Sequence, residues 1–227
     1  MLNIGQFFDR MVREYAEMGY RRCMAVRRTA PGTQEPGTKD RPLSFIERTR
    51  RHQLIEVTIN LVAEHGYAAT SLARIAQAAG ITKGAVLYHF DSKDAVVAAA
   101  HAHVLGALVD DVGAAVDAAP ADQAPAAYVR RMVGHLAERP GHARMIIEVM
   151  INGGRPDSAA RWKPLAALLQ DARQARGLGP GTDLRTLALI AGGAIDAIIG
   201  ERLQDADYDA EAAAESLITM LEAAAFA

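Results

Sequence analysis

Cysteine, aromatic residues and long apolar runs are scarce in this sequence of 227 residues. The single cysteine, Cys23, cannot form a disulfide within the chain and leaves no cysteine-based zinc site. Aromatic residues make up 5% of the chain, and few segments alternate in the manner of half-buried strands. No uninterrupted apolar run approaches about 18 residues, and Asp9-Arg10 breaks the apolar start before a secretory signal could form. The sequence therefore predicts a cytoplasmic protein without strands and without a membrane partner.

Motifs of the common enzyme classes are also missing. The chain has no G-x-S-x-G, no H-E-x-x-H and no phosphate-binding glycine loop. The acidic pair Asp110-Asp111 is expected to lie on a solvated helix face. We therefore expect no catalytic residue, no enzymatic activity and no cofactor. The alternative is a helical enzyme or carrier that does chemistry in its C-terminal part, which would require a converging catalytic pair that the sequence does not display.

Histidines are the remaining candidates for a metal site. His101 and His103 stand two residues apart, so they point to different faces of a helix. His135 and His142 flank a Pro-Gly step and can converge, but no third ligand is obvious near them. The sequence therefore predicts that no metal is bound.

Helix-forming residues are abundant. Alanine dominates many stretches and half of all residues are hydrophobic, so the chain is predicted to be all-α with a sizeable core. Glycine and proline clusters beyond residue 92 separate roughly six helices. Residues 1–94 carry 14 Lys and Arg against 10 Asp and Glu, whereas residues 95–227 carry 11 against 17. The basic first part is the one expected to meet a polyanion.

Residues 1–44 are predicted to form a disordered or extended tail. Residues 29–42 are rich in turn formers and lack apolar periodicity. Residues 1–23 have the spacing of a short amphipathic helix, which leaves two interpretations open. They form a partner-binding helix, or they are an over-extended reading frame whose native start is Met24.

The stretch after the tail has the pattern of a helix-turn-helix unit. Apolar residues recur at helical spacing over 47–65, and Gly66 is predicted to end that helix. A short helix over 71–79 follows, capped by Thr70 or Ser71, and another, capped by Thr82, runs from about Lys83 to His89. Gly80 lies between them and can adopt a positive φ, which lets the chain reverse within about three residues.

The residues of this unit resemble the tetracycline-repressor-like (TetR) family of regulators. Residues 79–94 read AGITKGAVLYHFDSKD, and the family pattern is A-G-(V/I)-(S/T)-K-G-x-(L/V)-Y-Y-H-F-x-S-K-(E/D). Residues 64–76, EHGYAATSLARIA, also follow the family pattern. The specific resemblance covers 47–97, and beyond it only length and helical character agree.

The resemblance implies that the second helix of the unit lies in the DNA major groove. Lys83 suits guanine N7 and O6, and the Ala85 methyl group can pack on a thymine methyl. Hydroxyl, aromatic and basic residues around the two short helices are placed for phosphate. The predicted DNA-contacting residues are Thr70, Ser71, Thr82, Lys83, Gly84, Ala85, Leu87, Tyr88, His89, Lys93 and Arg51.

The sequence departs from the family at three positions. Leu87 stands where the family usually has the first of two aromatic residues, Ala85 replaces a frequent threonine, and Asp91 occupies an often basic position. Each change removes a polar or positive contact. We therefore expect DNA affinity to depend more on other cations, among them the arginines of residues 48–51.

The C-terminal part is predicted to hold an effector pocket and a dimer interface. Adaptable methionines and the lone tryptophan suit a ligand site, although each residue has a place in an ordinary core as well. The predicted pocket residues are Met132, His135, Met145, Ile146, Val149, Trp162, Leu165 and Leu169. The resemblance implies that the last two helices, 183–203 and 208–226, pair with a second copy. The predicted interface residues are Ile190, Gly193, Ala194, Ala197, Ile198, Leu217, Met220 and Leu221.

These observations predict a helix-turn-helix DNA-binding domain over 45–92 and an effector-binding, dimerisation domain over 93–227. The resemblance implies a homodimeric repressor that holds a palindromic DNA operator until a small-molecule effector releases it. Two alternatives stay open. One is an activator, or a regulator that binds DNA only with its ligand. The other is a dimeric small-molecule-binding protein with weakened DNA reading.

Overall fold

The structure, a computed structural model, describes residues 44–152, 158–179 and 183–227. Within these ranges every regular element is a helix, which confirms the all-α prediction. The six helices expected beyond residue 92 are α5 to α10. The predicted tail lies outside the described residues except for Ser44. The helices are α2 (Phe45–Ala69), α3 (Leu72–Ala78), α4 (Lys83–His89), α5 (Lys93–Asp117), α6 (Ala124–Glu138), α7 (Pro140–Asn152), α8 (Ser158–Ala175), α9 (Leu184–Gln204) and α10 (Ala210–Phe226).

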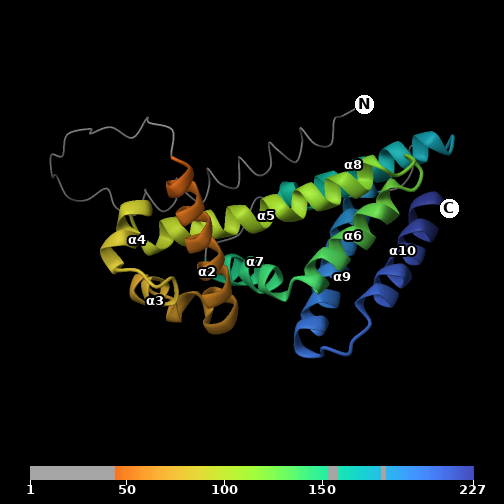
Figure 1. The fold of residues 1–227 in the computed structure, drawn as a ribbon. Coiled ribbons are helices and arrows are strands. Elements are labelled where there is room, and N and C mark those ends of the chain that lie inside the picture. The colour runs from red at the N-terminus through yellow and green to blue at the C-terminus, as the bar shows by residue number, and fades with distance from the viewer. Residues whose placement is uncertain (1–43, 153–157, 180–182) are drawn as a thin grey trace, which may run out of the picture.

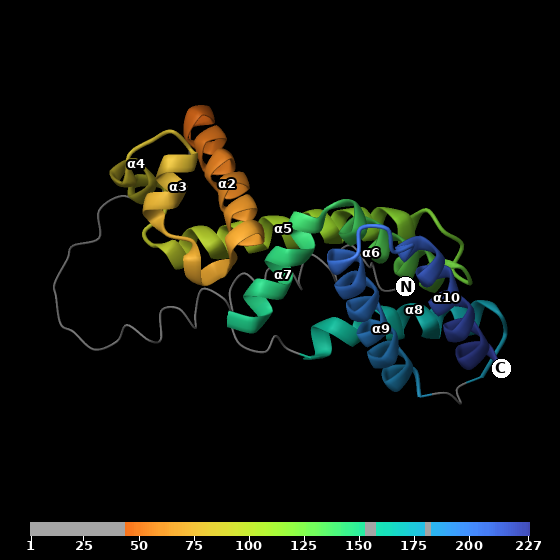
Figure 2. The ribbon, with the colours of Figure 1, turned by 90° about the horizontal axis from the view of Figure 1, so that it is seen from below.

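Helix α5 connects the two groups of helices. It starts beside α2 and α4 at one end and runs to the group formed by α6, α8, α9 and α10 at the other (Figure 1). Helix α7 lies between the two groups and packs against both α2 and α5 (Figure 2). One continuous helix therefore belongs to both parts of the chain.

Side-chain caps define where the first helices begin. Ser44 forms a capping box with Glu47, in which each side chain accepts the other residue's backbone N–H. Ser71, Thr82 and Ser92 cap α3, α4 and α5 by accepting an N–H three residues further on. Of the two predicted caps for α3, the structure therefore selects Ser71.

The turn between α3 and α4 has the geometry that the sequence predicted. Gly80 has φ 66°, a left-handed conformation in which a side chain would be strained. Its N–H donates to the Gln77 carbonyl, and the Ile81 N–H donates to the Ala76 carbonyl. This pair of bonds is a Schellman motif, which ends α3 and turns the chain into α4.

Gly66 bends α2 rather than ending it. With φ 77° and ψ 167° it leaves the helical region, but a further turn, Tyr67–Ala69, follows before the cap at Thr70. The prediction that the helix ends at Gly66 is therefore correct for the break and wrong for the final turn. The break matters because the first N–H groups of a new turn have no helical carbonyl to bond.

Three apolar clusters hold the helices together. The first joins α2, α3 and α4 to the start of α5 through residues such as Leu54, Ile75, Val86 and Phe90. The second fills the C-terminal group between the far half of α5 and helices α6 to α10. The third lies where α2, α5 and α7 meet, and its fully buried members include Val104 and Met145. Burial of side chains of this size stabilises the fold by roughly 1.5–3 kcal/mol each.

Within the described residues, α5 is the one helix long and apolar enough to cross a membrane by length and composition. The prediction of no membrane span rested on the length of uninterrupted apolar runs, whereas this test averages over a window and so tolerates single charges. A core helix meets the same test, and α5 supplies residues to all three clusters.

Asp111 was predicted to lie on a solvated helix face, and the structure adds that this partly exposed side chain is also ion-paired. Its carboxylate accepts a hydrogen bond from Arg131 and lies 2.6 Å from Nδ1 of the buried His135. The hydrogen bond from Arg131, with a smaller contribution from His135, lowers the pKa of Asp111 to about 2. The His135 Nε2 atom lies 3.2 Å from Nδ1 of His142, so these two histidines converge as predicted. This network ties α5, α6 and α7 together.

Candidate nucleic-acid interface

The first turn of α4 faces solvent. Thr82, Lys83 and Gly84 are exposed, whereas Val86 points inward and is completely buried. A Cβ on Gly84 would meet only the Thr82 hydroxyl, at 3.8 Å, so packing within the described residues does not demand glycine here. A close approach from outside the chain is therefore the more direct reason for the small residue.

The rest of α4 presents a mixed surface. Ala85 and His89 are half-buried, and Leu87 is 40% exposed. Leu87 therefore lies on the outer face, where an apolar side chain can make no polar contact. Burial, with the Arg51 charge second, lowers the pKa of His89 below its usual range. Its ring is thus a neutral hydrogen-bonding group near neutral pH.

Thr70 and Ser71 differ despite being neighbours. Thr70 is 1% exposed and its hydroxyl donates to the Gly66 carbonyl at 2.9 Å. Ser71 is exposed and caps α3. In this conformation the Thr70 side chain is enclosed by protein and cannot reach a phosphate, so the prediction of a DNA contact there is corrected.

Two other predicted phosphate ligands already hold protein partners. The Tyr88 side chain is 72% exposed, and its hydroxyl donates to the Glu47 carboxylate at 2.9 Å, which joins α4 to the start of α2. The Lys93 ammonium donates to the Tyr67 carbonyl at 2.6 Å and lies 3.8 Å from the centre of the Tyr67 ring. Lys93 thus holds the bend of α2.

Arg51 binds the C-terminal end of α4. Its guanidinium donates to the His89 carbonyl and stacks 4.1 Å from the centre of the Phe90 ring. The last carbonyls of a helix lack internal partners and carry partial negative charge, so an arginine there is favourable. The structure thus gives Arg51 a positioning role for α4 that the sequence pattern did not indicate.

Glu148 of α7 holds the bend of α2 from the other side. Its carboxylate accepts the Tyr67 N–H at 2.8 Å and lies against Gly66, where a Cβ would come within 3.4 Å of it. Asn152 donates to the same carboxylate at 3.3 Å. The sequence offered no signal for this contact, because it joins residues 81 positions apart.

The predicted pocket residues fall into two of the clusters. Leu165, Leu169, Met132 and Trp162 belong to the C-terminal core, and Met145, Ile146 and Val149 belong to the junction of α2, α5 and α7, whereas His135 is buried in the polar network with Asp111. Ile146 packs against both. Four of the eight are completely or almost completely buried: His135, Met145, Leu165 and Leu169.

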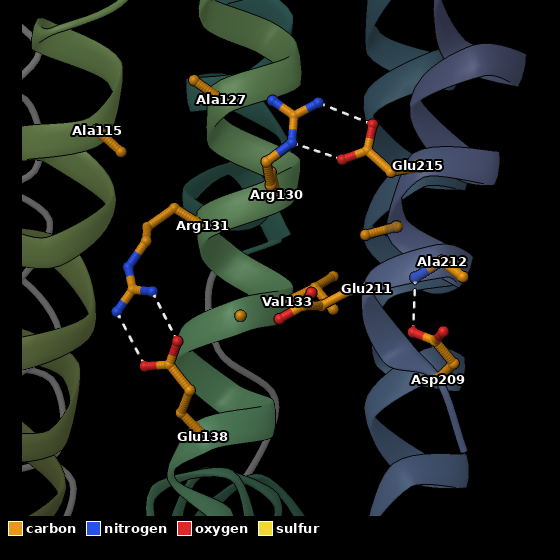
Figure 3. Close-up of a pocket in the computed structure, with 12 residues that line it drawn as sticks. Ala115, Ala127, Arg130, Arg131, Val133, Glu138, Asp209, Glu211, Ala212 and Glu215 are labelled. Carbon is orange, nitrogen blue, oxygen red and sulfur yellow. Dashed lines mark hydrogen bonds and ion pairs between the residues drawn. The ribbon is translucent and has the colours of Figure 1, made fainter. Parts of the chain in front are cut away.

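A groove of about 580 Å³ lies elsewhere, between α6 and α10 with α5 beside it (Figure 3). Its walls carry the paired charges Arg130–Glu215 and Arg131–Glu138. None of the eight predicted pocket residues is among those that line it.

The predicted dimer residues divide by exposure. Ile190 and Met220 are 62% and 63% exposed, and Gly193 and Ala197 are exposed beside Ile190 on α9. Ala194 is partly buried. The remaining three, Ile198, Leu217 and Leu221, are buried between helices of the same chain. Their prediction as interface residues is corrected for this conformation.

The sequence of the first part matches a known family. Residues 54–100 match the family model described as bacterial regulatory proteins, tetR family. Over this span the chain is similar to the regulators of that family. The matched span contains the end of α2, all of α3 and α4, and the start of α5.

Two curated transcriptional regulators are similar to part of the chain. The HTH-type transcriptional regulator BetI of Burkholderia thailandensis is 39% identical over 92 residues, which are 40% of this chain and 46% of that protein. The HTH-type transcriptional repressor KstR2 of Rhodococcus jostii is 40% identical over 63 residues, 28% of this chain and 29% of that protein. The match therefore spans less than half the length of either relative.

Solved structures of transcriptional regulators share the fold over most of the chain. The fatty acid degradation regulator FadR from Bacillus halodurans superposes with a TM-score of 0.66 at 21% identity, covering 80% of this chain and 96% of that one. A TetR-like regulator from Rhodococcus sp. RHA1 gives 0.66 at 18% identity, covering 82% and 100%. FadR from Bacillus subtilis, in complex with stearoyl-CoA, gives 0.64 at 21% identity, covering 75% and 96%.

We expect Arg51→Ala to lower the free energy of unfolding by about 1–3 kcal/mol, because the His89 carbonyl loses a charged donor and Phe90 its cation. Urea denaturation monitored by circular dichroism measures the change. Arg144→Ala, at an exposed arginine on α7, is the control and should change stability by no more than about 0.5 kcal/mol. Equal effects of the two substitutions would contradict the role of Arg51.

Proposed function

We propose that this chain is a cytoplasmic transcriptional regulator that binds DNA as a homodimer. In this proposal it is a repressor released by a small-molecule effector, and it performs no catalysis. The observation that carries the proposal is the exposed first turn of α4, with Lys83 and Gly84 facing solvent on a helix-turn-helix unit of the tetR family. The named relatives BetI and KstR2 are a regulator and a repressor.

The proposed DNA contacts are sorted by the position of each side chain. Lys83 reads base edges, and Thr82 and Ala85 accompany it at the start of α4. Ser71, at the exposed N-terminus of α3, contacts phosphate. Tyr88 reaches a phosphate when its hydroxyl exchanges the Glu47 carboxylate for it, and His89 is a neutral donor.

The effector is proposed to bind where the predicted pocket residues line α6, α7 and α8. Helix α7 connects this region to the bend of α2 through Glu148, so a ligand that shifts α7 also shifts the DNA-binding unit. A coupling of about 1–3 kcal/mol would change operator affinity about 5–150-fold. Since the FadR of Bacillus subtilis was solved with stearoyl-CoA, acyl-CoA thioesters are the first effector class to assay.

The proposed dimer uses the exposed face of α9 and α10. The face of α9 carries Ile190, Gly193 and Ala197 in solvent, and Met220 extends it on α10. A Cβ on Gly192 or Gly193 would meet no described atom within 4 Å. Each helix-interior glycine costs about 1 kcal/mol relative to alanine, so close approach of a second copy is the reason we assign to them. Two copies are also what reading successive major grooves requires.

The DNA-reading proposal predicts a preference that depends on Lys83. Fluorescence anisotropy with the DNA upstream of the coding sequence, compared with scrambled DNA, should show tighter binding to the native sequence by about 10³-fold or more. Lys83→Ala should reduce that preference about 5–150-fold, since one base contact contributes about 1–3 kcal/mol.

Lys163→Ala removes an exposed lysine from α8 and should leave the preference unchanged. A salt series separates the two kinds of contact, because phosphate binding weakens steeply with salt whatever the sequence. Weak binding that is equal on both DNAs and vanishes with salt would contradict sequence-specific DNA reading.

The dimer proposal predicts that Ile190→Glu produces monomers, because it places a charge in an apolar contact between copies. Sedimentation velocity at micromolar concentration measures the mass directly. The matched control is Ile151→Glu, which changes an exposed isoleucine on α7, away from the proposed interface, and should remain dimeric. A wild-type monomer, or an Ile190→Glu dimer, would rule out this interface.

A further inference from the structure

Two histidines and a glutamate converge on the junction between α2 and α5. His52 and Glu56 stand four residues apart on α2, and therefore on one face of that helix. His103 reaches them from α5, with its Nε2 atom 3.2 Å from the Glu56 carboxylate. The His52 Nε2 atom lies 3.9 Å from the same carboxylate oxygen. One ligand atom of each residue falls within 4.8 Å of the other two.

These distances suit a divalent transition metal. Zinc binds imidazole nitrogen and carboxylate oxygen at about 2.0–2.2 Å in tetrahedral geometry, which places two ligand atoms of one ion about 3.3–3.5 Å apart. The separations of 3.2 and 3.9 Å lie close to that value, so small side-chain rotations would close the set. Two imidazoles and a carboxylate also form a ligand set that zinc sites use with an open fourth position.

The site is accessible to an ion. The side chain of His52 is 62% exposed, that of Glu56 45% and that of His103 35%. The His52 and His103 rings already stand edge to face with their centres 5.1 Å apart. The charges of Glu56 and His103 also act on His142, which is bonded to His135 behind them. The three ligands therefore form a set that is open to solvent on one side.

We propose that His52, Glu56 and His103 form a binding site for one divalent transition metal ion of the zinc class, which clamps α2 to α5. The ion would bind a ring nitrogen of each neutral imidazole and offset the negative charge of the Glu56 carboxylate. It links the helix that carries Arg51, and through it α4, to the helix that runs through the whole molecule. The expectation of no metal weighed two other histidine pairs and missed this one, because the three residues come from helices separated in sequence.

Isothermal titration of the full-length, untagged protein with ZnCl2 near neutral pH tests the site. We expect one ion per chain with micromolar affinity or tighter, and a rise in melting temperature when zinc is added, since an ion that binds the folded state stabilises it. MgCl2, which prefers oxygen ligands, should not bind there. Cys23 remains in every variant, so zinc held by that thiol would survive the substitutions.

His103→Gln and His52→Gln should each weaken zinc binding at least about 10-fold and abolish the rise in melting temperature. The second variant changes the most exposed of the three ligands, so it tests the site even where loss of His103 disturbs folding. His65→Gln, at a histidine of α2 that pairs with Glu64 outside the cluster, is the matched control and should bind zinc like the wild type. Binding that is absent in the wild type, or unchanged in His52→Gln, would overturn the proposal.

Discussion

The bend of α2 at Gly66 is the constraint on which the arrangement of the molecule depends. The break exposes the Tyr67 N–H, and that donor would be costly to leave unpaired. Glu148 of α7 accepts it, while Lys93 of α5 donates to the Tyr67 carbonyl. One residue of the DNA-binding unit is thus bound by both helices that connect it to the rest of the chain. The apolar cluster beneath Tyr67 stabilises the contact between the helices but is not directional. The hydrogen bonds are directional, so they fix the orientation of the first helices relative to α5 and α7.

Helix α4 is also held in place by a small number of specific contacts. The helix has seven residues, too few to be stable alone. Thr82 caps its start, Arg51 holds its end, and Val86 fills the core beneath it. Apart from the hydrogen bond from the exposed Tyr88 to Glu47, these contacts are made on the inner face or at the ends. The first turn of α4 therefore stays exposed, which is how a short helix can be rigid and still present its side chains to a partner.

Local signals in the sequence predicted the parts of the fold that depend on neighbouring residues. The serine and threonine caps, the positive φ of Gly80 and the helical spacing of the core act within a few positions, so their physics is visible in the sequence. Contacts such as Glu148 with Tyr67 join distant positions, and no spacing rule can find them. The dimer prediction shows what periodicity cannot tell about a surface. It places Leu217 on an apolar helix face, but it does not say whether that face is covered by the same chain or by a second copy.

We propose that α7 controls the orientation of the unit formed by α2, α3 and α4 through Glu148. DNA affinity of Glu148→Ala, measured by fluorescence anisotropy on the native upstream DNA, tests it most directly. We expect a loss of about 5-fold or more, because the freed unit must be ordered on binding. Glu148→Gln keeps an oxygen to accept the Tyr67 N–H and should retain most of the affinity, and Arg144→Ala, one turn away on α7, should retain all of it. Wild-type affinity in a folded, dimeric Glu148→Ala variant would contradict the claim.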